Sequence, residues 1–111
     1  MPDPVVDGKL FALARSARAR IEAAEGAAVV DETGRTYSAV NVNLPHLRLS
    51  AVAAVVAVAA GAGARALSAC VVVGDADGIS SADVQVAADL ECSSVVLRRP
   101  GGEVVARWEA P

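Results

Sequence analysis

The sequence predicts an α/β fold in which helices cover both faces of a five-stranded mixed sheet, so that the domain has three layers. The order of the predicted segments is the first reason: helix, two strands, helix, strand, helix, two strands. The second is the length of 111 residues, which is typical of one domain with one core, here residues 1–111. The third is the composition. With 25 Ala and 19 Val, the chain has enough apolar surface to offset its conformational entropy.

The first predicted helix runs from about Gly8 to Ala24, and Asp7 serves as its N-cap. Apolar residues recur along it at helical spacing. These are Leu10, Leu13, Ala14, Ala17 and Ile21. Two apolar runs follow, 27–31 and 36–42, and the turn between them contains Gly34. They predict a β-hairpin.

The second predicted helix has no polar face. A loop over Asn41–Arg48 precedes it, because Pro45 disfavours a helix there. Ser50 then caps a helix over about Ala51–Ala62, which consists almost entirely of Ala and Val. A helix that is apolar all round is buried on more than one side. We therefore expect the sheet to cover one face and a second subunit to cover another.

The last third of the chain predicts a central strand, a helix and a closing hairpin. The run Ala66–Val73 is β-branched and bounded by glycine, as in strands buried on both faces. The segment Ser80-Ser81-Ala82-Asp83 resembles a capping box, with Asp where Glu or Gln usually stands, and it opens a helix to about Leu90. The closing hairpin is predicted over 95–98 and 103–108.

Charge and composition argue against several partners. A net charge of −3 gives no general attraction to phosphate backbones or anionic lipid, and three aromatic residues are few for base stacking. We therefore expect no nucleic-acid partner. The longest uncharged run, 49–64, is short for a membrane span of roughly 20 residues, and no secretion pattern follows Met1. We expect a cytoplasmic protein in which Cys70 and Cys92 are reduced, buried thiols.

Three segments resemble the cytidine deaminase family. That family's G-R-x-[YF]-x-G-x-N-V-E-N is matched by Gly34-Arg35-Thr36-Tyr37-Ser38-Ala39-Val40-Asn41-Val42-Asn43. Its A-S-Y-G-L-T-x-C-A-E-R is matched at Leu49 and Ala53. The segment R-Q-V-L-x-E-F, which follows P-C-x-x-C, is matched by Gln85–Leu90. The spacing agrees over about residues 8–107, and the resemblance implies a cytidine deaminase-like fold.

The resemblance also implies a zinc ion held by three protein ligands and a glutamate that moves protons, but the sequence departs from the family at all of these positions. The ligand position in the second helix is Val52, and the glutamate position is Ala54. The two cysteine positions of P-C-x-x-C are Ser80 and Asp83. Valine has no ligand atom, serine is a poor ligand, and one aspartate cannot hold the ion alone. We therefore expect no catalytic residue, no metal and no cofactor.

The substrate side of the family's site is reduced as well. The N-V-E pattern binds ribose through an amide and a carboxylate in the family. Here Asn41 keeps the amide, and Asn43 replaces the carboxylate. These two are the candidate ligand-binding residues, with the alternative that Asn41 bonds only to backbone. Of the aromatic-bearing Y-S-x-F-x-V-G-A-A pattern, only Gly26-Ala27-Ala28 remains. The single histidine, His46, is expected to be a solvent-exposed loop residue and not a metal ligand.

Three functions follow from these residues. We expect a catalytically inactive cytidine deaminase-like protein that acts as an oligomeric interaction or structural module. The resemblance implies a dimer or tetramer assembled through the helix Ala51–Ala62, and an unidentified protein partner is a further option. The second function is a non-catalytic nucleoside or nucleotide binder that uses Asn41 and Asn43. The third is a cytidine deaminase-type hydrolase with an unusual site.

Overall fold

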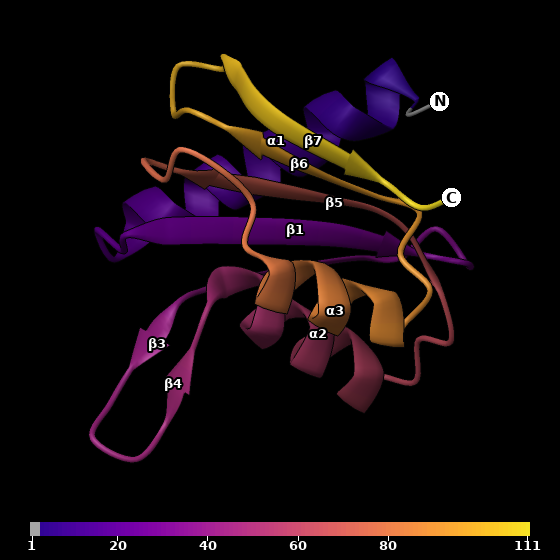
Figure 1. Cartoon of the computed structure of the whole chain (residues 1–111), viewed down its shortest axis with the longest axis horizontal. Helices are drawn as coiled ribbons and strands as arrows, with labels where there is room; N and C mark the ends of the chain where they lie inside the picture. Colours follow the sequence, from indigo (N-terminus) through magenta and orange to yellow (C-terminus); the bar gives the residue numbers. More distant parts are fainter. Residues whose placement is uncertain (1–2) are drawn as a thin grey trace.

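A five-stranded mixed sheet lies between helices in the computed structural model, which describes residues 3–111 (Figure 1). The elements are α1 (Pro4–Arg20), β1 (Glu25–Asp31), β2 (Thr36–Val40), β3 (Val42–Asn43), β4 (Arg48–Leu49), α2 (Ala51–Gly61), β5 (Leu67–Gly74), α3 (Ser81–Asp89), β6 (Ser94–Arg98) and β7 (Val104–Glu109). The strand order is β2-β1-β5-β6-β7, in which β5 and β6 run parallel and the other neighbours antiparallel. The predicted mixed sheet and the predicted order of its elements are confirmed.

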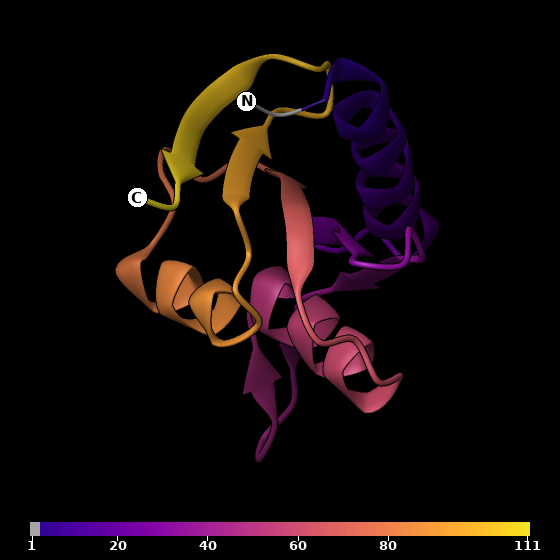
Figure 2. The same cartoon turned by 90° about the vertical axis from the view of Figure 1, so that its right-hand side faces the viewer.

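The helices occupy both faces of the sheet, and Figure 2 shows α1 on one side with α2 and α3 on the other. On the α1 side, Leu10 and Ala14 pack against a small apolar cluster from β1 and β5. A larger cluster fills the opposite side, beneath α2 and α3. Because successive side chains of a strand point to opposite faces, β5 contributes to both clusters. Its Val71 and Val73 face α1, while Cys70 and Val72 face α2 and α3, so the predicted central strand is confirmed.

Helix α1 begins and ends four residues earlier than the predicted span Gly8–Ala24. Its N-cap is Asp3, whose carboxylate accepts a hydrogen bond from the backbone N–H of Val5 at 2.9 Å, and Pro4 stands where a missing N–H costs nothing. The prediction of Asp7 as the cap was therefore wrong. The chain leaves the helix after Arg20.

Asp7 instead joins α1 to the closing hairpin. Its carboxylate forms an ion pair with the guanidinium of Arg98 at 3.0 Å, and both side chains are largely buried. The same guanidinium lies over the ring of Phe11, 4.2 Å from its centroid, and its Nε donates to the carbonyl of Gly102 at 2.9 Å. One arginine therefore holds the first turns of α1 against the turn between β6 and β7.

The predicted loop Asn41–Arg48 contains a short hairpin. Val42 pairs with Leu49 and Asn43 with Arg48, and the N–H of Leu44 donates to the carbonyl of Leu47 at 2.8 Å. Pro45 does exclude a helix, but it lies in the turn, where it interrupts no strand pairing. The hairpin projects beyond α2 in Figure 1.

Helix α2 is buried on one side only. Ser50 is its N-cap, as predicted, and its hydroxyl accepts from the N–H of Ala53 at 3.0 Å. The buried residues are Ala51, Val52, Ala54, Val55, Val56 and Ala59. Ala57, Val58 and Ala60 are exposed, with Val58 at 48%. The expectation of burial on more than one side is therefore not met within a single chain. None of the helices in residues 3–111 has both the length and the hydropathy to cross a membrane.

Candidate functional site

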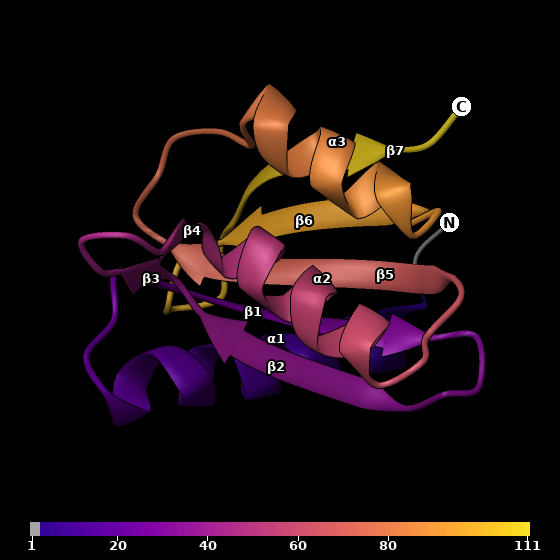
Figure 3. The ribbon, with the colours of Figure 1, turned by 90° about the horizontal axis from the view of Figure 1, so that it is seen from below.

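The family's zinc and glutamate positions lie where α2 and α3 begin side by side on one face of the sheet (Figure 3). Val52, in the first turn of α2, is 1% exposed and belongs to the apolar core. Ala54 is 7% exposed. Ser80 is the N-cap of α3, and its hydroxyl accepts from the N–H of Asp83 at 3.1 Å. The side chains at these positions therefore pack the core or cap a helix.

The carboxylate of Asp83 bonds to the other helix. It accepts a hydrogen bond from the hydroxyl of Ser50 at 2.6 Å, and Ser50 is the cap of α2. In a complete capping box the carboxylate would accept from the backbone N–H of Ser80 instead. Only half of the predicted capping box therefore forms, and the carboxylate bonds to the cap of α2 instead.

Glu25 is a residue of this site that the sequence analysis did not identify. It begins β1, and its carboxylate accepts from the N–H of Ala51, the first residue of α2, at 2.8 Å. A negative charge at this end of a helix meets unpaired N–H groups and the positive end of the helix dipole. A sequence signal existed, because Glu25 stands at the valine of the family's V-G-A-A pattern.

The space beside the start of α3 is small. A cavity of about 20 Å³ lies there, with the carboxyl-bearing Glu25 and Asp83 on its wall together with the apolar Val72, Ile79 and Leu97. A polar cavity of this size has room for about one water molecule. It cannot admit a pyrimidine ring as it stands.

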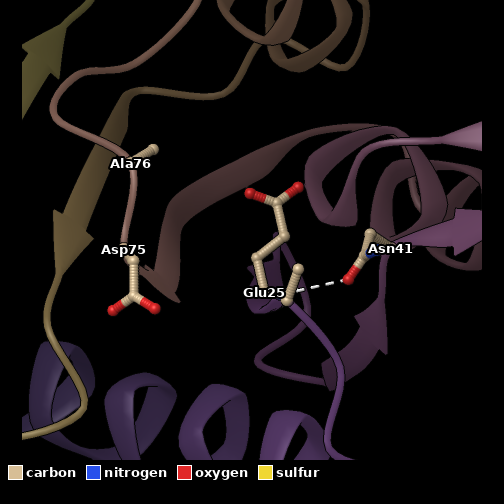
Figure 4. A pocket seen from close by; sticks show the side chains of 5 residues that line it. Glu25, Asn41, Asp75 and Ala76 are labelled. Carbon is tan, nitrogen blue, oxygen red and sulfur yellow. Dashed lines mark hydrogen bonds between the residues drawn. The ribbon is translucent and has the colours of Figure 1, made fainter.

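A second, open hollow of about 390 Å³ lies beside Asn41 (Figure 4). Asn41 and Glu25 line one side, and Asp75 and Ala76 lie across from them. The amide oxygen of Asn41 accepts from the N–H of Glu25 at 3.0 Å, and the Asn41 N–H donates to the Glu25 carbonyl at 3.3 Å. Asn41 thus pins its neighbouring backbone, which is the alternative expected from the sequence.

Asn43 and His46 lie away from this hollow. Asn43 is exposed in β3, where it pairs with Arg48, and His46 is exposed in the turn of the same hairpin. Neither lines the hollow, so the structure brings Asn41 to it without Asn43.

The loop on the far side of the hollow is held by Arg99, which the sequence analysis also missed. Its guanidinium donates to the carbonyls of Gly74 at 3.1 Å and of Ala76 at 2.5 Å. Arg18 of α1 forms an ion pair with Asp75 at 3.3 Å. These contacts fix the backbone that faces Asn41.

The two cysteines are buried in the cluster beneath α2 and α3. Burial raises the pKa of the Cys70 thiol well above its usual value and also raises the pKa of Cys92. The Cys92 thiol donates to the carbonyl of Ser94 at 3.2 Å. Because a thiol binds metal as the thiolate, these raised pKa values oppose metal binding.

The residues present do not fit a zinc ion. Val52 has no donor atom, the Ser80 hydroxyl caps α3, and one oxygen of Asp83 is bonded to Ser50. Across residues 3–111, no three His, Cys, Asp or Glu side chains lie together in a way that could hold a metal ion.

Comparisons with known proteins agree with the architecture. The sequence profile of the family described as cytidine deaminase-like matches residues 4–102. The structure is similar to a cytidine deaminase from Burkholderia pseudomallei, with a TM-score of 0.78, 27% identity and coverage of 92% of this chain and 91% of that one. It is also similar to a cytidine deaminase from Mycobacterium leprae, with a TM-score of 0.67, 22% identity and coverage of 88% and 92%. A comparison with curated proteins gives no significant match.

Proposed function

The chain belongs to the cytidine deaminase-like family, and from this premise we propose that it is a non-catalytic member that acts as a self-associating module through the exposed face of α2. The observation that carries the first half is the side-chain set at the helix ends. Val52, Ala54, Ser80 and Asp83 supply neither a zinc site nor the family's glutamate. The cavity of about 20 Å³ beside Asp83 is also too small for a base.

The exposed face of α2 supports the second half. Ala57, Val58 and Ala60 are exposed, and no charged residue occurs from Ala51 to Ala64. A contiguous uncharged apolar face of this kind is typical of a protein interface. A second copy of the same face, related by two-fold symmetry, would match it in size and lack of charge.

Val58→Asp tests the self-association. We expect the unaltered chain to run as a dimer or larger assembly at micromolar concentration in light scattering coupled to gel filtration. The variant should be monomeric, because association would bury an unpaired carboxylate. Val104→Asp on β7 is the matched control, since Val104 is exposed to a similar extent, 45% against 48% for Val58. A monomeric unaltered chain, or a Val58→Asp variant that assembles normally, would contradict the proposal.

The absence of catalysis is tested separately with cytidine and added zinc. We expect the ultraviolet absorbance of cytidine to stay constant during incubation with the purified chain. A loss of absorbance that needs zinc and stops when a chelator is added would contradict the non-catalytic half and leave the self-association untouched.

The open hollow beside Asn41 supports a second candidate function, nucleoside binding without reaction. Its volume of about 390 Å³ is in the range of small-molecule sites. Glu25 and Asp75 both line it, so a phosphorylated ligand would meet like charges and an uncharged nucleoside would not.

A thermal-shift titration with cytidine, uridine and their monophosphates tests this candidate. A nucleoside at 100 times its dissociation constant should stabilise the chain by about 2.7 kcal/mol, which is several degrees for this size. We expect Asn41→Ala to abolish the ligand-induced shift and Asn43→Ala, outside the hollow, to keep it. No shift with any nucleoside, or a shift that survives Asn41→Ala, would contradict binding at this hollow.

A further inference from the structure

We propose that a carboxylate bridge, formed by Glu25, Ser50 and Asp83, fastens the first turns of α2 and α3 to each other and to β1 without a metal ion. The residues at the family's zinc positions lie on these same two helix ends, and they do not fit a metal. In this chain, hydrogen bonds of the bridge connect the two helix ends that carry the family's zinc positions.

Helix α2 has no acidic residue in its own first turn. The charges that favour this helix end come from elsewhere in the chain. Glu25 delivers one from β1, through the 2.8 Å bond from the N–H of Ala51. Asp83 delivers the other from α3, through the 2.6 Å bond from the hydroxyl of Ser50. Removing either carboxylate should therefore destabilise the first turn of α2, although neither residue belongs to that helix.

The hydroxyl of Ser50 joins the two caps. It has one proton, which it donates to Asp83, and it accepts the N–H of Ala53 at 3.0 Å. Asp83 in turn donates its own N–H to Ser80, the cap of α3, at 3.1 Å. A single chain of hydrogen bonds thus runs from the first turn of α2 to the cap of α3. Because Asp83 and Ser50 are partly buried and one is ionised, this bond is of the stronger kind.

Helices α2 and α3 otherwise meet through apolar side chains of the large cluster. This packing sets how the two helices cross. The bond between Ser50 and Asp83 adds a directional contact at their first turns, since its length and angle are restricted.

A double-mutant cycle on the full chain tests the bridge. Ser50→Ala, Asp83→Ala and the double variant are unfolded in urea at one protein concentration. We expect the two single effects on the unfolding equilibrium constant, multiplied together, to exceed the effect of the double variant by roughly tenfold. The control cycle pairs Ser50→Ala with Asp3→Ala. Asp3 caps α1 on the opposite face of the sheet and shares no hydrogen-bond partner with Ser50, so its effect should multiply with that of Ser50→Ala to within about twofold.

If the effects of Ser50→Ala and Asp83→Ala on the unfolding equilibrium constant simply multiply, the proposed bridge is overturned. Should Asp83→Ala not fold, Asp83→Asn takes its place. It keeps an acceptor oxygen without the charge, so a smaller coupling than tenfold but above the control is expected, and coupling equal to the control overturns the proposal. The metal-free half is tested by adding zinc or a chelator to the unaltered chain. We expect an unchanged melting temperature, and a shift of several degrees with either reagent would overturn it.

Discussion

Gly26→Ala is expected to lower the free energy of unfolding by about 3 kcal/mol, a large effect for one added methyl group. Gly26 lies in β1 directly beneath α1, and a Cβ there would overlap the backbone carbonyl oxygen of Ala14. It would also crowd the backbone and Cβ of Arg18. Backbone atoms cannot be moved by changing a rotamer, so α1 would have to shift away from the sheet as a body.

Gly8→Ala is the matched control in urea denaturation. Gly8 lies inside α1, and a Cβ there would meet no atom within 4 Å. Alanine has a higher helix propensity than glycine, so this variant should be more stable by about 0.5 to 1 kcal/mol. The same substitution is thus expected to act in opposite directions at the two positions. Equal effects would mean that α1 does not pack on β1 as closely as described.

Val55→Asp is expected to leave no folded protein. Val55 is fully buried in the cluster beneath α2, and an aspartate there would have no partner for its charge. The cost of an unpaired buried charge is about 5 kcal/mol or more, which is comparable with the whole stability of a small domain.

Val58→Asp is the control for this effect as well, because it places the same residue three positions later on the exposed side of α2. Its cost to the fold should be below about 1 kcal/mol, so circular dichroism should show native helix and strand content. The two variants measure which side of α2 faces the sheet. An unfolded Val58→Asp, or a folded Val55→Asp, would show that the burial of α2 differs from that described.

The side of α2 that is buried was not predictable from the sequence, for a physical reason. A helix reveals its inner face through the contrast between apolar and polar positions, and Ala51–Ala62 offers none. For β5 the lack of alternation between apolar and polar residues was informative, because a strand buried on both faces needs none. Its predicted position in the centre of the sheet is confirmed. The caps Ser50 and Ser80 were predicted because a cap depends on local residues only. At α1 the predicted cap was Asp7, but the cap is Asp3, which is followed by Pro4, a residue that suits the first helical position.

In the candidate site, too, the local features were predictable and the long-range contacts were not. The spacing of family motifs placed Val52 and Asp83 at the two helix ends, where the structure has them. The contacts these ends make were not predictable, since Glu25 lies 26 positions from its partner in α2 and Ser50 lies 33 positions from Asp83. Such pairs arise only when the sheet has brought distant segments together.

The ion pair between Asp7 and Arg98 has a consequence for folding kinetics. Its residues are 91 positions apart, so the pair closes nearly the whole chain into one loop. The entropy lost in closing that loop is recovered only after the sheet between them has formed. We therefore expect the contact to be weak or absent in the transition state for folding. Its removal should then speed unfolding and change the folding rate little.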